Sequence, residues 1–169
     1  MKTQASTCIK SSFKWDAAAI IITIIFDAVL ISCVISAFRC SIVLFEIIAL
    51  LVTLLCALFF PIRLIVTEDT IKIRRPIGTV KIEMKDVLSC SIIEDEKRFF
   101  DHIIRTFGSG GAYGYWGYFH HDKYGRFRFF VTHRKQCFLV RLKDGKSYAI
   151  SSEKRDGIVR FITENIPPR

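Results

Sequence analysis

Two apolar runs stand back to back near the start of the chain, and they constrain its fold more than any other feature. The first covers residues 17–38 and the second residues 41–62. A helix rises about 1.5 Å per residue and the hydrocarbon core of a bilayer is about 30 Å thick, so each run is long enough to cross once. Because only Arg39 and Cys40 separate the runs, we expect a transmembrane helical hairpin with its tip at these two residues.

The basic residues on either side of the apolar runs predict the orientation of the hairpin. Lys10 and Lys14 precede the first run and Arg63 follows the second, whereas Arg39 is alone at the tip. The positive-inside rule then places both termini in the cytoplasm. The sequence therefore predicts a multi-pass protein of the inner cell membrane, with a cytoplasmic segment over residues 1–16 and a cytoplasmic domain over residues 63–169.

Charge and hydropathy are segregated along the chain. Hydrophobic residues make up 51% of it and the net charge is +9, yet residues 17–62 hold only three acidic or basic side chains. This pattern excludes a wholly soluble protein. The many Phe, Tyr and Ile residues after position 62 also exclude a disordered tail, because they can bury a core. A basic domain beside a bilayer is attracted to anionic headgroups, although membrane insertion also favours basic cytoplasmic flanks.

The polar side chains inside the apolar runs include Asp27, Glu46 and Thr53. Folding the hairpin about its tip places Asp27 opposite Thr53, and places Glu46 nearer the tip by roughly 9 Å of helix rise. Three interpretations stay open for the two acids. Each is protonated or bonded to a nearby hydroxyl such as Thr53, or they bind another membrane helix, or they line a proton or ion path in an oligomer.

After residue 62 the apolar spacing changes to a period of 2, which is typical of strands. Residues 63–84 predict three short antiparallel strands, with turns at Glu68–Asp69 and Pro76–Gly78, and a fourth strand follows over 87–93. Helical spacing over 99–107 predicts one or two helical turns, and the glycines that follow predict a loop that enters a strand. Further strands are predicted at residues 115–120, 126–132, 136–142 and 146–150.

The chain ends in a predicted amphipathic helix that runs to about Asn165, capped by Ser151 or Ser152. The fold class is therefore α+β, with a two-helix transmembrane hairpin, seven or eight antiparallel strands and a C-terminal capping helix. The order of these elements resembles the pleckstrin-homology (PH) fold, and more specifically the bacterial PH-like proteins with two membrane helices before the domain. The stretches that carry the resemblance are LIVTEDTIKIRRPIGTVKI, FGSGGAYGYWGYF, GRFRFFVT and VRLKDGKSYAIS.

The resemblance implies a PH-like barrel or sandwich over about residues 63–166, and it says more about topology than about activity. PH domains that bind phosphoinositides carry a basic cluster around their first two strands, but the corresponding loop here is Glu68–Asp69, which argues against specific inositol-phosphate recognition. Attraction to anionic lipid remains open. The candidate headgroup contacts are Arg63, Lys72, Arg74, Arg75 and Lys81.

The stretch over residues 108–119 interleaves glycines with aromatic residues and is the best candidate for a recognition surface. Its aromatic side chains either pack inward as core or face a partner or the membrane interface. The candidate partner-binding residues are Tyr113, Tyr115, Trp116 and Tyr118.

The sequence predicts no catalytic, cofactor or metal site. GxSxG, HExxH and GxxxxGK[ST] do not occur, and none of the six cysteines is spaced as CxxC. His120 and His121 are adjacent, so in a strand they point to opposite faces and do not easily share an ion. Arg and Phe alternate over residues 126–130 as in an ordinary half-buried strand, and this argues against nucleic-acid binding.

We therefore expect a non-enzymatic binding or scaffold module, anchored in the lipid bilayer, that serves as an accessory component of a membrane protein complex. The expected partner is another protein or a second copy of the chain. The alternatives are an anionic-lipid sensor, or an oligomeric ion path through Asp27 and Glu46.

Overall fold

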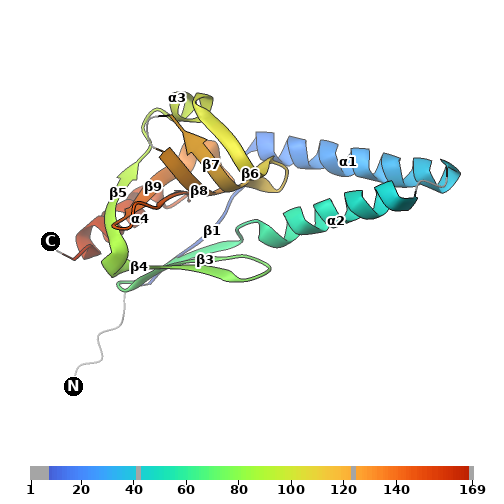
Figure 1. The fold of residues 1–169 in the computed structure, drawn as a ribbon. Coiled ribbons are helices and arrows are strands. Elements are labelled where there is room, and N and C mark those ends of the chain that lie inside the picture. Colours follow the sequence, from blue (N-terminus) through green and yellow to red (C-terminus); the bar gives the residue numbers. More distant parts are fainter. Residues whose placement is uncertain (1–7, 41–42, 123–124, 168–169) are drawn as a thin grey trace, which may run out of the picture.

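The computed structural model describes residues 8–40, 43–122 and 125–167. Two helices, α1 (Ala17–Cys40) and α2 (Val43–Phe59), project together from one end of a β-rich body (Figure 1). Among the described residues, Ala17–Ser36 is long and apolar enough to cross a membrane, and Leu50–Phe59 is a shorter apolar helical segment. The structure therefore shows the two helices, while their passage through a bilayer stays a prediction. Arg39 and Cys40, expected at the tip of the hairpin, belong to α1.

The first sheet has four antiparallel strands in the order β1–β2–β3–β4. Alternate side chains point inward along each strand, so that Leu64, Ile71 and Val80 are buried while Lys72 and Lys81 are exposed. The strand bounds are β1 (Ile9–Ser12), β2 (Arg63–Val66), β3 (Thr70–Arg74) and β4 (Thr79–Glu83).

The second sheet has six strands in the order β5–β9–β10–β8–β7–β6. Short 3₁₀ turns at Met84–Asp86 and Arg134–Gln136 lead into β5 and β9. The strand bounds are β5 (Val87–Ile92), β6 (Ile103–Gly111), β7 (Gly114–His121), β8 (Gly125–Val131), β9 (Cys137–Leu142) and β10 (Ser147–Ser151).

Both faces of the second sheet are covered, which gives the body two hydrophobic cores. The larger core lies between the two sheets and is closed by helix α4 (Arg155–Asn165), which contributes Ile158 and Ile162. The second core lies on the opposite face, under helix α3 (Glu96–Asp101) and the first turn of α1. Strand β8 serves both cores, because Phe129 faces one and Phe130 the other.

Two features of the sheets differ from the sequence-based expectation. The described residues form ten strands rather than seven or eight, because β1 and most of β6 were not predicted. The prediction of wholly antiparallel strands was also wrong, since β8 and β10 pair in parallel. Strand direction is set by which segments meet in space, and period-2 spacing carries no information about it.

Residues 103–111 form strand β6 and not a helical turn followed by a loop. Helix α3 ends at Asp101, and β6 pairs with β7 through Gly108 and Gly117, which lie directly opposite each other. Both glycines have positive φ, and a Cβ on either one would collide with the backbone of the facing strand. These glycines therefore allow β6 and β7 to pair closely. From the sequence alone, the same cluster of glycines predicts a loop.

The C-terminal helix was predicted correctly but its cap was not. Helix α4 begins at Arg155 after Lys154, and no side chain caps its first turn. Ser152 instead donates a hydrogen bond to Ser11 of β1 at 2.8 Å and accepts one from the backbone N–H of Lys154. The serine therefore connects the start of the helix to the first sheet, which local spacing does not reveal.

Candidate binding surfaces

The first helix is fixed to the second sheet at its first turn. The carboxylate of Asp16 accepts hydrogen bonds from the backbone N–H groups of Ala19 at 2.7 Å and Arg134 at 3.1 Å. The backbone N–H of Asp16 donates to the carbonyl of Thr132 at 2.9 Å. Asp16 therefore caps α1 and also holds it against the segment that follows β8. The sequence signal, an Asp before an apolar run, was present but was not singled out.

The turn between β6 and β7 contacts α1 about two helical turns further on. The backbone N–H of Tyr113 donates to the hydroxyl of Thr23 at 2.9 Å, and the Tyr113 hydroxyl donates to the carboxylate of Asp27 at 3.1 Å. The rings of Trp15 and Phe60 lie 6.3 and 6.4 Å from that of Tyr113. Burial raises the pKa of Tyr113, and the bond to Asp27 raises it further.

These contacts bear on the polar residues of the apolar runs. A hydroxyl does bond to Asp27, and it comes from Tyr113, 86 positions away along the chain. Thr53 is half-buried on α2, and the side chain of Glu46 lies outside the described part of the structure. The ion-path interpretation stays a prediction.

The end of α2 is held by the turn between β3 and β4. The backbone N–H of Ile77 donates to the carbonyl of Leu58 at 3.2 Å. Phe59 stacks on Trp116 of β7 with ring centroids 5.8 Å apart, and the guanidinium of Arg75 lies 5.4 Å from the centroid of the Phe59 ring. We call this region, together with the contacts of Asp16 and Tyr113, the helix junction.

The four aromatic residues predicted to meet a partner fall into different environments. Tyr113 lies in the helix junction, and Trp116 is 8% exposed against Phe59. Tyr115 is 5% exposed, and its hydroxyl accepts a hydrogen bond from Nε of Arg134 at 2.7 Å. Tyr118 is half exposed, with the guanidinium of Arg128 over its ring. The structure therefore supports the core-packing alternative for Tyr115 and Trp116.

Four of the five predicted headgroup contacts gather on the outer face of the first sheet, namely Arg63, Lys72, Arg74 and Lys81. Arg63 lies opposite Arg74, and Lys72 opposite Lys81. We call this the basic sheet face. The Arg63–Arg74 pair follows the end of α2 directly, and Lys72 and Lys81 lie about 7 Å further along the strands. Arg75 is separate, because it turns toward Phe59.

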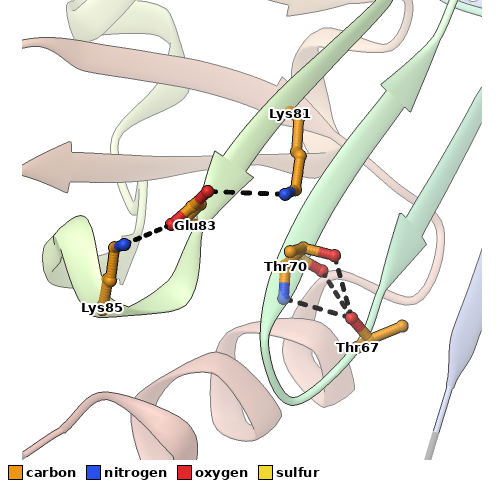
Figure 2. Close-up of polar contacts among 5 residues, drawn as sticks. All are labelled: Thr67, Thr70, Lys81, Glu83 and Lys85. Atoms are coloured by element: carbon orange, nitrogen blue, oxygen red, sulfur yellow. Dashed lines mark hydrogen bonds and ion pairs between the residues drawn. The ribbon is translucent and has the colours of Figure 1, made fainter.

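One carboxylate neutralises part of this face. Figure 2 shows Glu83 between Lys81 at 3.4 Å and Lys85 at 2.7 Å. The hydrogen bond from Lys85 and its charge, followed by those of Lys81, lower the pKa of Glu83. Across the described residues, no carboxylate forms an ion pair with Arg63, Lys72 or Arg74. The uncompensated charge is thus on the side of the face nearest α2.

A groove of about 810 Å³ lies between α3 and the second sheet, at the end formed by β5 and β9. Its wall carries both signs of charge, including Asp95, Arg98 and Arg141, and an apolar floor at Leu139. His121 is buried beside the groove and stacks on Phe99 with ring centroids 5.2 Å apart. Among the described residues, no group of three His, Cys, Asp or Glu side chains could hold a metal ion.

Two packed sheets with a closing C-terminal helix and several open surfaces define a PH-like module. The family model described as bacterial PH domain matches residues 62–166. This match covers more than half of the chain, and the chain belongs to the bacterial PH domain family. No curated protein and no solved structure matches it. PH domains are in general non-catalytic modules that bind lipids or proteins, so membership indicates a binding role.

Proposed function

We propose that this chain is a membrane-anchored scaffold module. The hairpin of α1 and α2 crosses the bilayer twice, both termini and the domain lie in the cytoplasm, and the domain binds a protein partner as an accessory component of a membrane complex.

The observation that carries the anchoring is the exposure of apolar side chains along both helices. Ile24 is 62% exposed, Leu44 72% and Leu50 68%, although both helices are attached to the body at their bases. Exposed apolar area of this extent is costly in water and is removed when lipid surrounds the helices. The helix junction then fixes the domain at the membrane surface in one orientation.

Reporter fusions to the full chain test the topology. We expect green fluorescent protein fused after Arg169 to fluoresce, and alkaline phosphatase at the same position to be inactive, because the C-terminus is cytoplasmic. Alkaline phosphatase fused after Cys40 should be active, because the helix tip faces the other side. The protein should also stay in the membrane pellet after alkaline carbonate extraction. An active C-terminal phosphatase, or release by carbonate, would contradict the proposal.

The groove between α3 and the sheet suits a peptide segment of a protein partner, since its floor is apolar and its rim carries both charges. Ser89 and Ser91 are exposed on β5 and line the groove, so Ser89→Tyr or Ser91→Tyr would fill it without entering either core. We expect either change to remove a stoichiometric protein that co-purifies with the tagged full chain from native membranes. Ser12→Tyr, on the exposed face of β1, is the matched control and should keep it.

The basic sheet face supports the second candidate, a sensor of anionic lipid. Its charges lie where α2 enters the domain, and each Lys or Arg close to an anionic surface adds about 1 kcal/mol of attraction. Salt-dependent binding to phosphatidylglycerol vesicles that falls with Arg74→Gln, together with the absence of any co-purifying protein, would favour this candidate over the scaffold.

A further inference from the structure

Two arginines lie over connected aromatic rings near the end of α2, since Phe59 stacks on Trp116 of β7 and Trp116 lies opposite Phe130 of β8. Arg75 lies over Phe59, and Arg128 lies over the rings of Tyr118 and Phe130 at 5.5 and 5.3 Å. In the part of the chain that the structure describes, neither forms an ion pair. Burial lowers the pKa of Arg75, and the positive charge of Arg128 lowers it further. Two guanidinium groups on connected aromatic rings, with no carboxylate paired to either, favour an anion.

The same place holds two buried donors with no acceptor. Nε of Arg75 and Nε1 of Trp116 are both closed off from water and have no hydrogen-bond partner among the described residues. Trp116 is more than nine-tenths buried, and its ring stacks on the same Phe59 that carries Arg75. Native structures seldom leave a buried donor unpaired, so two unpaired donors at one place point to a ligand that supplies acceptors.

The position of Arg75, Arg128 and Trp116 in the fold indicates which anion would bind to them. The turn that carries Arg75 is hydrogen-bonded to the last turn of α2 through Ile77 and Leu58. Ile77 is 51% exposed beside it, and Phe107, opposite Tyr118 on β6, is 69% exposed. Arginines bordered by exposed apolar side chains at the end of a membrane helix lie at the depth of lipid headgroups, where the abundant anion is the lipid phosphate.

We propose that Arg75, Arg128 and Trp116 form a site for the phosphate of an anionic phospholipid at the cytoplasmic membrane surface. The guanidinium groups bind the phosphate oxygens, which Arg does with paired N–H donors, and the buried donors gain acceptors when the lipid is bound. The location of the site rests on the proposed membrane anchoring. It is distinct from the basic sheet face, which is open and carries its charges on long exposed side chains.

The chain contains two tryptophans, Trp15 and Trp116, so the Trp15→Phe variant makes Trp116 the reporter of its own site. The full chain in neutral detergent is titrated with dihexanoyl phosphatidylglycerol, dihexanoyl phosphatidylcholine and inorganic phosphate. We expect a saturable change of emission with phosphatidylglycerol, at least about tenfold weaker apparent affinity for phosphatidylcholine, and no change with phosphate. Native mass spectrometry of the unaltered chain counts bound phosphatidylglycerol independently of the Trp15→Phe change.

Arg75→Gln and Arg128→Gln should each weaken phosphatidylglycerol binding on the order of tenfold, because each removes charged hydrogen bonds to the phosphate. The matched controls Lys97→Gln on α3 and Lys143→Gln in the turn after β9, both exposed and away from the basic sheet face, should change it by less than about twofold. Equal losses in the controls, an equal response to inorganic phosphate, or no bound lipid by either method would overturn the proposal. Carbonate extraction of the same proteins reports on anchoring separately, because short-chain lipids reach the site without a bilayer.

Discussion

The hydroxyl of Tyr113 donates a hydrogen bond to the carboxylate of Asp27 at 3.1 Å. One residue lies at the tip of a β-hairpin and the other lies ten residues into the apolar helix α1, so the bond connects the domain to the helix that we place in the membrane. A carboxylate in an apolar segment is costly unless it is paired or protonated. Tyr113 supplies a partner for Asp27, and the pair helps to set the angle between domain and helix.

Removing this hydroxyl should destabilise the protein. We expect Tyr113→Phe to lower the free energy of unfolding in detergent by about 1–3 kcal/mol, since Asp27 loses a donor in a partly buried place. Thermal unfolding followed by fluorescence measures the effect. Tyr118→Phe is the control, because Tyr118 is half exposed, and it should have little effect. Equal melting temperatures for Tyr113→Phe and the unaltered chain would show that the bond contributes nothing.

The cysteines should differ sharply in reactivity. Burial raises the pKa of Cys90 from 9.0 to about 12, whereas Cys8 is exposed. At pH 8 the thiolate fraction of Cys90 is then roughly a thousandfold below that of an ordinary thiol, and the thiolate is the form that reacts. Mass spectrometry after brief iodoacetamide treatment should find Cys8 modified and Cys90 intact. Rapid modification of Cys90 in the folded protein would show that its thiol is not buried. In guanidinium, where the chain is unfolded, Cys8 and Cys90 should react at similar rates.

Two glycines should respond to alanine in opposite directions. Gly117 has positive φ, and a Cβ there would collide with the backbone of Phe107 on the paired strand, so we expect Gly117→Ala to cost several kcal/mol or to prevent folding. Gly157 lies in α4 with open space around it, so Gly157→Ala should stabilise the protein by about 0.5–1 kcal/mol. Thermal unfolding of the two variants compares them. A tolerated Gly117→Ala would mean that β6 and β7 are further apart than described.

Asp16 should be important for the start of α1. We expect Asp16→Ala to destabilise the protein by about 1–2 kcal/mol, because it removes the cap of the helix and the acceptor for the backbone of Arg134. Asp16→Asn keeps an oxygen acceptor and should lose less. Denaturant unfolding in detergent measures both changes. If Asn and Ala substitutions are equally harmful, the negative charge rather than the hydrogen bonds is what matters at this position.

Local patterns determined much of this protein. The unbroken apolar runs predicted two helices, because backbone hydrogen bonding within a helix needs no distant partner. Alternation predicted the strands that the structure shows as β3, β4 and β8. The order of these elements also indicated the PH-like family that the chain belongs to.

Tertiary structure alone decided which segments meet. Strand β1 is four residues long with two serines, and it forms because β2 offers a free edge; β6 forms because Gly108 and Gly117 face each other. The bond from Tyr113 to Asp27 and the stacking of Phe59 on Trp116 join positions far apart in the chain. Sequence spacing reports the face on which a residue lies within its own element. Which element covers that face depends on packing across the whole fold, and the candidate sites of this protein lie at those contacts.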